Sequence, residues 1–402
     1  MQLKHLSLTN FRNYARLDRD VPNGLLLITG ENGQGKTNLI EAINFLSSFV
    51  SFQAETDRQL IHFVATRDPL AVGRIVADFE VEQNPHRLEV RIIQEKEIGD
   101  GNGRLRKEVI YDGVKQKIAE VIGQFKSVIF LPQSLQIIAG APEERRRFLN
   151  LALGQVIPHY SAILAEYTRA LNQRNALLKL LAENNGDANQ LNYWDSEISQ
   201  LGARLIHARI HALIELENLA YPFYRQLTHE TEILRFVYQP SFDPLGNRGG
   251  QYTLPVDVQI DRRGLPLEQI QESFQAKLLK LRGEEINRGM TTIGPHRDEI
   301  RFMGNGIDLG VYGSRGQVRT AILALKFAEM NWMKKKSGQW PVFLLDEVLA
   351  ELDEQHRHDL FAQLSNFDQV ILTTTDINLF SSQFLQNAQI WQVQAGQISL
   401  LE

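Results

Sequence analysis

The sequence predicts an α/β protein in which a buried sheet carries a phosphate-binding loop and a long helical segment interrupts the sheet domain. Two observations support this fold class. Residues 24–30 form the short apolar run of a strand buried on both faces, and Gly30 to Thr37 then satisfy the pattern G-x-x-x-x-G-K-[ST] before a helical pattern. From Tyr160 to about Leu227 the apolar residues follow helical spacing instead.

The composition is that of an ordinary globular chain. Its 402 residues are 43% apolar and 23% charged, which suffices for one large or two medium domains. No apolar run approaches the roughly 18 residues of a membrane span, and we expect a cytoplasmic protein. The absence of cysteine excludes disulfides, thiolate metal sites and cysteine nucleophiles. Because the net charge is −5, any nucleic-acid surface must be a local basic patch.

The first part of the sheet domain is assigned to residues 1–135. Alternating or continuous apolar patterns predict strands at residues 3–8, 24–30, 75–81, 88–92 and 127–131. Asn84-Pro85 and Asp112-Gly113 are predicted as turns of antiparallel hairpins, and a helix is predicted to begin just after Gly35. The result is a mixed sheet with an antiparallel β lobe.

A helical lid domain is assigned to residues 136–240, with about 285 as its outer limit. Pro142 opens its first helix, and a helical hairpin follows with arms at 160–181 and 189–227 and a break at 184–187. The sheet domain is predicted to resume over 286–402. Helices are predicted at 267–281 and 317–333, and strands near 300 and at 342–345 and 370–373. The blocks 94–106 and 243–252 are predicted as surface extensions.

The loop Gly30-Glu31-Asn32-Gly33-Gln34-Gly35-Lys36-Thr37, together with Asn38, is predicted to bind ATP. Its glycines let backbone N–H groups wrap the phosphates, and the helix N-terminus adds a favourable potential. Lys36 should reach the β- and γ-phosphates, and the Thr37 hydroxyl should hold Mg²⁺.

A carboxylate pair, Asp346-Glu347, ends the apolar strand 342–345. Acids that emerge at the carboxyl end of a buried strand lie where α/β sheets bind their ligands. Asp346 is predicted to bind Mg²⁺, directly or through water, and Glu347 to orient the water that attacks the γ-phosphate. With Lys36 they form the candidate catalytic set.

The spacing of these motifs indicates the class of ATPase. Lys36 and Asp346 are 310 residues apart, and the segment from Gly313 to Arg319 lies just upstream of the acidic strand. That segment resembles the ABC signature, in which Ser314, Gly316 and Gln317 would face the γ-phosphate held by a partner subunit. A glycine turn that starts a helix is the simpler alternative. The position before the Asp346 strand favours an ABC-type P-loop ATPase head that forms an ATP-dependent homodimer.

Two further segments follow the acidic strand. Residues 350–353 occupy the place of a loop that contacts the second subunit, and Thr373 to Thr375 end the next strand. The threonines suit either a γ-phosphate contact or simply the β-branched composition of a strand.

Several blocks of the chain resemble the RecF family. They are residues 8–14, 37–43, 140–149, 171–175, 294–298 and the signature segment. The resemblance implies an ABC-type head related to SMC heads, an inserted lid and weak DNA-associated ATPase activity. It also implies an ATP-driven dimer that binds duplex DNA near single-strand gaps, helps load recombinase and acts in the SOS response. RecR, and less directly RecO, are the implied partners.

Three positions depart from the family pattern. Residues 48–52 lack an expected arginine, Gln133-Ser134 replace an acidic pair, and Glu347 replaces aspartate but still offers a carboxylate. Whether Gln133 senses the nucleotide stays open.

Clustered cations supply the candidates for DNA contact, since phosphate binding is built from lysine and arginine. They are Arg145, Arg146, Arg147, Lys334, Lys335 and Lys336. The arginines suit an internal ion-pair network equally well, and the lysines suit the end of a solvated helix.

Other ATPase classes fit less well. A transporter subunit would be shorter and lack the hairpin, and an SMC-type chromosome organiser needs arms of hundreds of residues. A nuclease fusion needs a further domain after the acidic strand. The remaining alternative is an SMC-like ABC ATPase that works as a clamp, with bound ATP as a switch and no hydrolysis.

Overall fold

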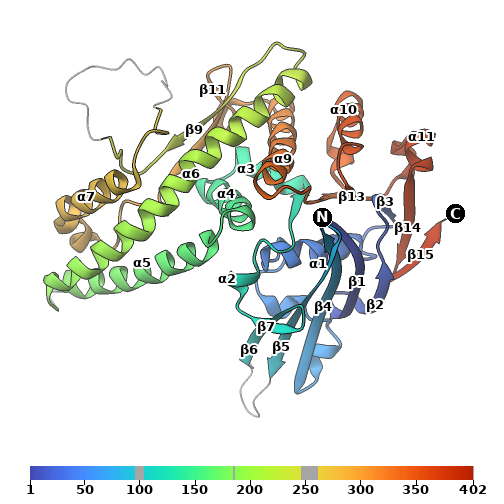
Figure 1. Cartoon of the computed structure of the whole chain (residues 1–402), viewed down its shortest axis with the longest axis horizontal. Coiled ribbons are helices and arrows are strands. Elements are labelled where there is room, and N and C mark those ends of the chain that lie inside the picture. Colours follow the sequence, from blue (N-terminus) through green and yellow to red (C-terminus); the bar gives the residue numbers. More distant parts are fainter. Residues whose placement is uncertain (96–103, 184–185, 246–260, 402) are drawn as a thin grey trace. The chain divides into compact units, whose positions relative to one another are not determined.

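The computed structural model describes residues 1–95, 104–183, 186–245 and 261–401 (Figure 1). The chain divides into two compact units. Unit 1 contains Met1–Ser134 and Lys326–Glu402, and unit 2 contains Leu135–Leu325.

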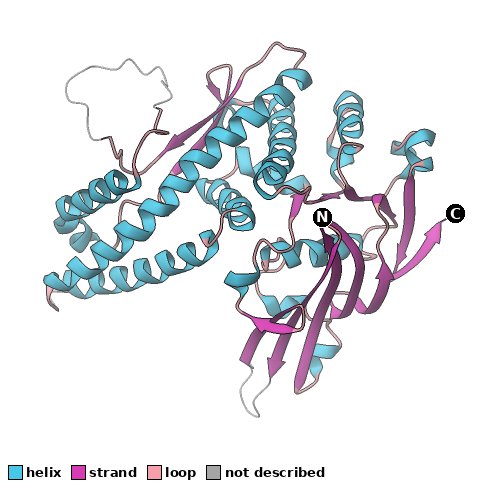
Figure 2. Ribbon diagram, viewed as in Figure 1, coloured by secondary structure: helices cyan, strands magenta, loops and turns pink. Residues whose placement is uncertain are grey.

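Unit 1 contains an antiparallel sheet of six strands in the order β2-β1-β4-β5-β6-β7 (Figure 2). Its strands are β1 (Gln2–Phe11), β2 (Tyr14–Asp20), β4 (Leu70–Val81), β5 (Asn84–Glu95), β6 (Arg104–Tyr111) and β7 (Val114–Gln116). Alternating residues such as Leu6 and Leu8 of β1 are fully buried. One face of this lobe therefore supplies core, as the alternation predicts.

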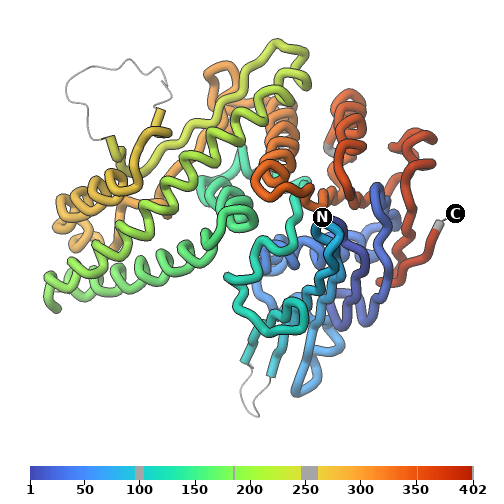
Figure 3. The backbone as a smooth tube through the Cα atoms, in the orientation of Figure 1, coloured from blue at the N-terminus to red at the C-terminus, as the bar shows by residue number. Residues whose placement is uncertain are grey.

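The second sheet of unit 1 carries the nucleotide motifs. Its order is β15-β14-β3-β13-β12-β8, and all neighbours pair in parallel except β14 and β15. The strands are β3 (Gly24–Thr29), β8 (Ser127–Phe130), β12 (Val342–Asp346), β13 (Gln369–Thr374), β14 (Ala388–Gln394) and β15 (Gln397–Leu401). Figure 3 shows how β3, from the beginning of the chain, lies between strands from its end. The parallel strands therefore bring distant motifs to one edge.

Helix α1 (Lys36–Ser48) connects the two sheets of unit 1. It packs against β8, β12 and β13 of the mixed sheet and against β4 of the antiparallel one. Leu39, Ile40, Ile43 and Phe45 are almost fully buried in this layer. Burying a large apolar side chain contributes roughly 1.5–3 kcal/mol, so the helix that starts at Lys36 is fixed along most of its length. The smaller helices of unit 1 are α2 (Ile118–Val121), α10 (Glu354–Leu364) and α11 (Ser382–Gln386).

Unit 2 is mainly helical. Its helices are α3 (Gln136–Ala139), α4 (Pro142–Val156), α5 (Tyr160–Ala182), α6 (Leu191–Leu227), α7 (Leu267–Arg288) and α8 (Leu309–Tyr312), and α9 (Arg315–Ser337) begins in it. Helices α5 and α6 form the predicted hairpin, with α7 packed against both (Figure 1). A short antiparallel sheet joins β9 (Leu234–Gln239), β10 (Glu299–Gly304) and β11 (Ile307–Asp308).

Buried ion pairs connect the three long helices of unit 2. Arg174 of α5, which is fully buried, pairs with Asp195 of α6 at 2.8 Å and with Glu285 of α7 at 2.7 Å. A buried charge is tolerated only when it is paired. Removing one partner would leave another charge buried without a counterion, so this cluster fixes the packing of α5, α6 and α7.

The second half of the sheet domain begins later than the sequence suggests. The division lies between Leu325 and Lys326, not at 286. Strand β10 pairs with β9 along its whole length and packs on α4, so residues 286–325 stay with the helical unit. The first division, after Ser134, lies beside the predicted 135.

Two local predictions need correction. The chain turns at Glu82 and Gln83, which both have positive φ, whereas Asn84 and Pro85 already belong to β5. The strong pairing of β4 with β5 holds two non-glycine residues in a conformation that favours asparagine or glycine. Residues 94–95 and 104–106, predicted as surface extension, belong to β5 and β6: Gln94 and Glu95 pair with Leu105 and Arg104, and Arg106 pairs with Ile93. Residues 96–103, 184–185 and 246–252 of the predicted loops lie outside the described residues.

His296 gives unit 2 a predicted pH dependence. Burial lowers the pKa of His296 to about 4, and its Nδ1 lies 2.7 Å from the Tyr167 hydroxyl. Between pH 6.5 and 4 the unfolded chain therefore binds a proton that the folded chain does not. The contribution of neutral His296 to the free energy of unfolding is complete above pH 6.5. It is lost as the pH falls towards 4, by roughly 3 kcal/mol in total.

The measurement is urea unfolding of the wild type and of His296→Gln between pH 7 and 4.5. The wild type should lose more stability on acidification, because other titrating groups are common to both proteins. Parallel pH profiles would show that His296 is not responsible.

Candidate nucleotide site

The segment predicted to bind phosphate, Gly30 to Thr37, lies between β3 and the first turn of α1. Gly30, Gly33 and Gly35 have φ values of 152°, 77° and 121°. Residues that carry a side chain rarely adopt these φ values. In addition, a Cβ atom at Gly35 would collide with the Asn13 side chain. Glycine is thus required for the path of the loop. Glu31, Asn32 and Gly33 are exposed at its tip.

Contacts from outside the motif hold the loop in shape. Asn13 Nδ2 donates to Gln34 O at 2.8 Å, and Asn38 Nδ2 donates to Asn13 Oδ1 at 2.8 Å. The turn after β14 adds two hydrogen bonds: Gly396 N donates to Gln34 O at 3.0 Å, and Ala395 N donates to Gln34 Oε1 at 2.7 Å. These positions were not predicted as site residues, except Gln34 and Asn38. Residues 395 and 396 support the loop through contacts with Gln34, which lies more than 300 residues earlier in the chain.

Lys36 lies inside the loop. Its side chain is only 3% exposed, and Nζ donates to Gly30 O at 2.9 Å and Glu31 O at 3.0 Å. Nζ also pairs with Glu347 Oε1 at 3.0 Å. The ammonium group is therefore positioned at the loop opening, where phosphate oxygens would replace part of this shell.

Asp346 and Thr37 meet at the carboxyl edge of the sheet. Thr37 Oγ1 donates to Asp346 Oδ1 at 3.1 Å, and Thr373 Oγ1 donates to the same oxygen at 2.7 Å. Burial raises the pKa of Asp346, and the Glu347 carboxylate adds to this, while the two hydroxyl groups oppose it. A divalent cation at this position would favour the charged carboxylate.

Glu347 has a backbone conformation that is unusual for its type. Its φ is 51°, and its N–H donates to Thr373 Oγ1 at 3.0 Å. A left-handed non-glycine residue costs of order 1–3 kcal/mol, and such residues cluster at active sites. Thr373 therefore contacts both acids. Thr374 bonds locally with Asp376, and Thr375 is exposed.

Gln133 is exposed in the turn that directly follows β8. Because β8 pairs in parallel with β12, Gln133 lies near the edge where Asp346 ends its strand. Among residues 350–353, Asp353 accepts a hydrogen bond from His356 N at 2.9 Å and so caps α10.

The signature segment begins α9 in unit 2. Ser314 N donates to Gln317 Oε1 at 3.1 Å, and Gln317 N donates to Ser314 Oγ at 3.2 Å. This is the reciprocal arrangement of a capping box. Ser314 and Gly316 are exposed, and Gln317 is half-buried.

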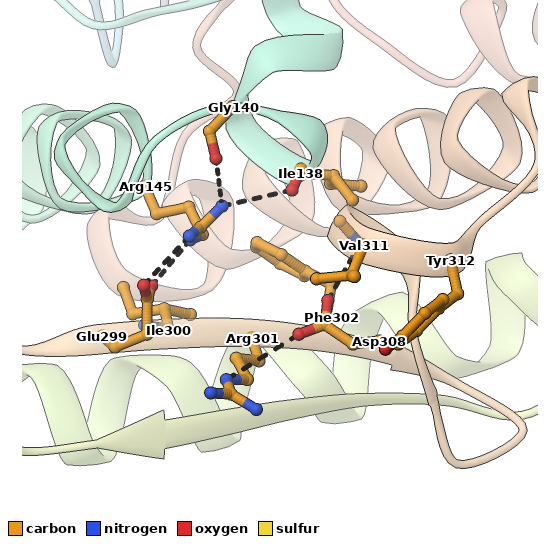
Figure 4. A pocket seen from close by; sticks show the side chains of 11 residues that line it. Ile138, Gly140, Arg145, Glu299, Ile300, Arg301, Phe302, Asp308, Val311 and Tyr312 are labelled. Atoms are coloured by element: carbon orange, nitrogen blue, oxygen red, sulfur yellow. Dashed lines mark hydrogen bonds and ion pairs between the residues drawn. The ribbon is translucent and has the colours of Figure 1, made fainter.

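Arg145 and Arg146 make internal contacts. Arg145 pairs with Glu299 at 2.7 Å and donates to Gly140 O at 2.7 Å, beside a pocket of about 300 Å³ (Figure 4). Arg146 donates to Asp298 O at 2.9 Å. These contacts fit the internal network rather than a free phosphate-binding surface. Arg147 is exposed.

Lys334, Lys335 and Lys336 are exposed in the last turn of α9. Lys334 Nζ lies 4.0 Å from the centre of the Trp340 ring. The run thus projects from unit 1, and its charges also suit a helix C-terminus.

Metal-binding clusters and membrane-spanning helices were considered over residues 1–95, 104–183, 186–245 and 261–401. No group of three or more His, Asp or Glu side chains there could hold a metal ion. No helix in the same ranges is long and apolar enough to cross a membrane.

Comparisons with known proteins agree on one family. The model of the RecF/RecN/SMC N-terminal domain matches residues 2–399. The DNA replication and repair protein RecF of Chloroflexus aurantiacus is 39% identical over 411 residues, and that of Roseiflexus castenholzii is 36% identical over 409. Both alignments cover 99% of each chain.

Solved structures give the same result. The recombination mediator protein RecF–ATPrS in the RecFOR pathway is similar with a TM-score of 0.83 and 28% identity, over 100% of this chain and 98% of that one. An Smc head from Pyrococcus furiosus has a TM-score of 0.52 at 15% identity, covers 99% and 95% of the two chains, and shows the fold alone. The predicted ABC-type head is confirmed. The chain belongs to the RecF family of DNA replication and repair proteins.

Proposed function

We propose that the protein is an ATP-dependent DNA-binding ATPase that dimerises on ATP, binds duplex DNA near single-strand gaps and helps load recombinase. The observation that carries this proposal is the meeting of Lys36, Thr37, Asp346 and Glu347 at one sheet edge. A carboxylate, a hydroxyl and a lysine in this arrangement suit a nucleoside triphosphate.

The site also fits Mg²⁺. Thr37 and Asp346 offer two hard oxygen ligands, and Mg²⁺ in such sites takes its remaining ligands from water and phosphate. The ion would neutralise negative charge on the phosphates. Lys36 would stabilise the γ-phosphate, and the Glu347 carboxylate would orient the attacking water and accept its proton. Thr373 would hold both acids in place.

Ser314, Gly316 and Gln317 are proposed to contact the γ-phosphate bound to a second copy, because they expose a helix N-terminus at the signature position. Slow hydrolysis would then release the dimer. RecR, and indirectly RecO and the recombinase, are the proposed protein partners. Support comes from the related RecF structure, which is described within the RecFOR pathway.

Light scattering tests the dimer. The wild type should change from monomer to dimer with ATP and Mg²⁺, and more completely with gapped DNA. Ser314→Arg should keep ATP binding but remain monomeric, since a bulky cation would block the helix N-terminus. Ser196→Arg, at an exposed serine of α6, is the matched control. A wild type that stays monomeric with saturating ATP and DNA would contradict the proposal.

A further inference from the structure

Three donors of the signature segment already have partners within the subunit. Ser314 and Gln317 satisfy each other's backbone N–H groups through their side chains. The side-chain amide Nε2 of Gln317 donates a hydrogen bond to Glu232 Oε1 at 3.2 Å. A carboxylate therefore already sits beside the residue that is proposed to face a phosphate.

Glu232 is held in this position from its other side. Tyr224 of α6 donates its hydroxyl to Glu232 Oε2 at 2.6 Å. Burial raises the pKa of Tyr224, and the hydrogen bond and charge of Glu232 raise it further, so the hydroxyl stays a donor. All these contacts lie within unit 2.

The backbone around Glu232 is also fixed. His229 and Glu230 have φ values of 51° and 64°, and Ile233 N donates to Asn305 Oδ1 at 2.9 Å. Two consecutive left-handed residues carry a conformational cost. The chain between α6 and β9 thus presents the Glu232 carboxylate to the signature helix.

We propose that Glu232 regulates dimerisation: its carboxylate competes with the terminal phosphate of a second copy's ATP for the side-chain amide of Gln317 in the signature segment. This inference rests on the proposed function. Charged acceptors form the stronger hydrogen bonds, and a helix N-terminus attracts anions. Two anions at the same donor repel each other, so the terminal phosphate of ATP must displace the resident carboxylate, and Glu232 thereby raises the ATP concentration that dimerisation requires.

Glu232→Gln separates charge from shape. The amide oxygen can still accept from Gln317, and the amide nitrogen can donate to the Tyr224 oxygen. Removing one charge should lower the ATP concentration for half-maximal dimerisation by about two- to fivefold, the order expected for a part-exposed charge. ADP should still give monomers.

Glu230→Gln is the matched control. Glu230 lies two residues away and pairs with Arg225, so its replacement removes a neighbouring charge that does not contact Gln317. Its ATP concentration for half-maximal dimerisation should equal that of the wild type. Thermal unfolding of all variants would show whether any effect comes from lost stability.

Glu232→Ala gives the opposing test. If Glu232 competes with phosphate, alanine also promotes dimerisation; if it only orients Gln317, alanine weakens the dimer. Light scattering across an ATP series measures both variants. Suppose that the wild type dimerises with ATP and that Glu232→Gln and Glu232→Ala need the same or a higher ATP concentration to do so. This result would overturn the competitor role but not the proposed function. If the wild type stays monomeric and only the Glu232 variants dimerise with ATP, the competitor role is supported, whereas the proposed ATP-driven dimer of the wild type fails. If none of them dimerises, both proposals fail.

Discussion

Glu347→Gln is expected to reduce ATP hydrolysis by about 10²- to 10⁴-fold, the usual contribution of a general base. The amide keeps the size of the side chain but cannot accept a proton. Nucleotide binding should persist, because Lys36 and the loop amides are unchanged. The variant should therefore accumulate as an ATP-bound dimer, which phosphate release and light scattering would measure together.

Two further proteins make this test decisive. Lys36→Met should lose ATP binding itself, and Glu82→Gln, at an exposed turn, should behave as the wild type. Equal hydrolysis by Glu347→Gln and the wild type would mean that another residue positions the water. A wild type that binds ATP without any turnover would instead favour the non-hydrolysing switch.

The centre of the site could be predicted because its determinants are local. The loop from Gly30 to Thr37 and the Asp346-Glu347 pair each follow a buried strand, and parallel strands bring their carboxyl ends together. Strand and helix patterns sufficed to place both. No knowledge of distant contacts was needed.

The supporting residues could not be predicted, since their roles depend on partners far away in the chain. The sequence leaves Thr373 as either a γ-phosphate contact or a β-branched strand residue, and it does not predict the hydrogen bond that Thr373 makes to Asp346 across 27 positions. Asn13 holds Gln34 through a contact that no spacing rule encodes. For Arg145 the sequence leaves DNA contact and an internal ion pair equally open, and the ion pair depends on Glu299, which lies 154 positions away.

The late return to the sheet domain has a similar cause. Strand β10 has the pattern of any half-buried strand, so its sequence does not tell which sheet it joins. The pairing of β10 with β9, which follows the helical hairpin, places β10 in the helical unit. Element types were therefore more predictable than domain borders.

ATP-gated DNA binding is expected to produce the other large effect. If Lys334, Lys335 and Lys336 contact phosphates, a dimer presents two such runs and up to six contacts. Log affinity should then fall with log salt at a slope of roughly −5 in ATP, and affinity should drop about 10³-fold between 50 and 200 mM salt. With ADP, the monomer should show about half that slope. Sequence preference should be weak, because backbone contacts carry no base code.

The measurement is binding to a gapped duplex across a salt series, with ATP and with ADP. Changing Lys334, Lys335 and Lys336 together to Glu should remove most of the slope, whereas the same charge change at the exposed Lys179, Lys277 and Lys280 of unit 2 should not. Equal affinity and slope in both nucleotide states would rule out ATP gating. If the first triple variant binds as the wild type does, the lysine run makes no DNA contact. Arg147, which is exposed, then becomes the next position to change.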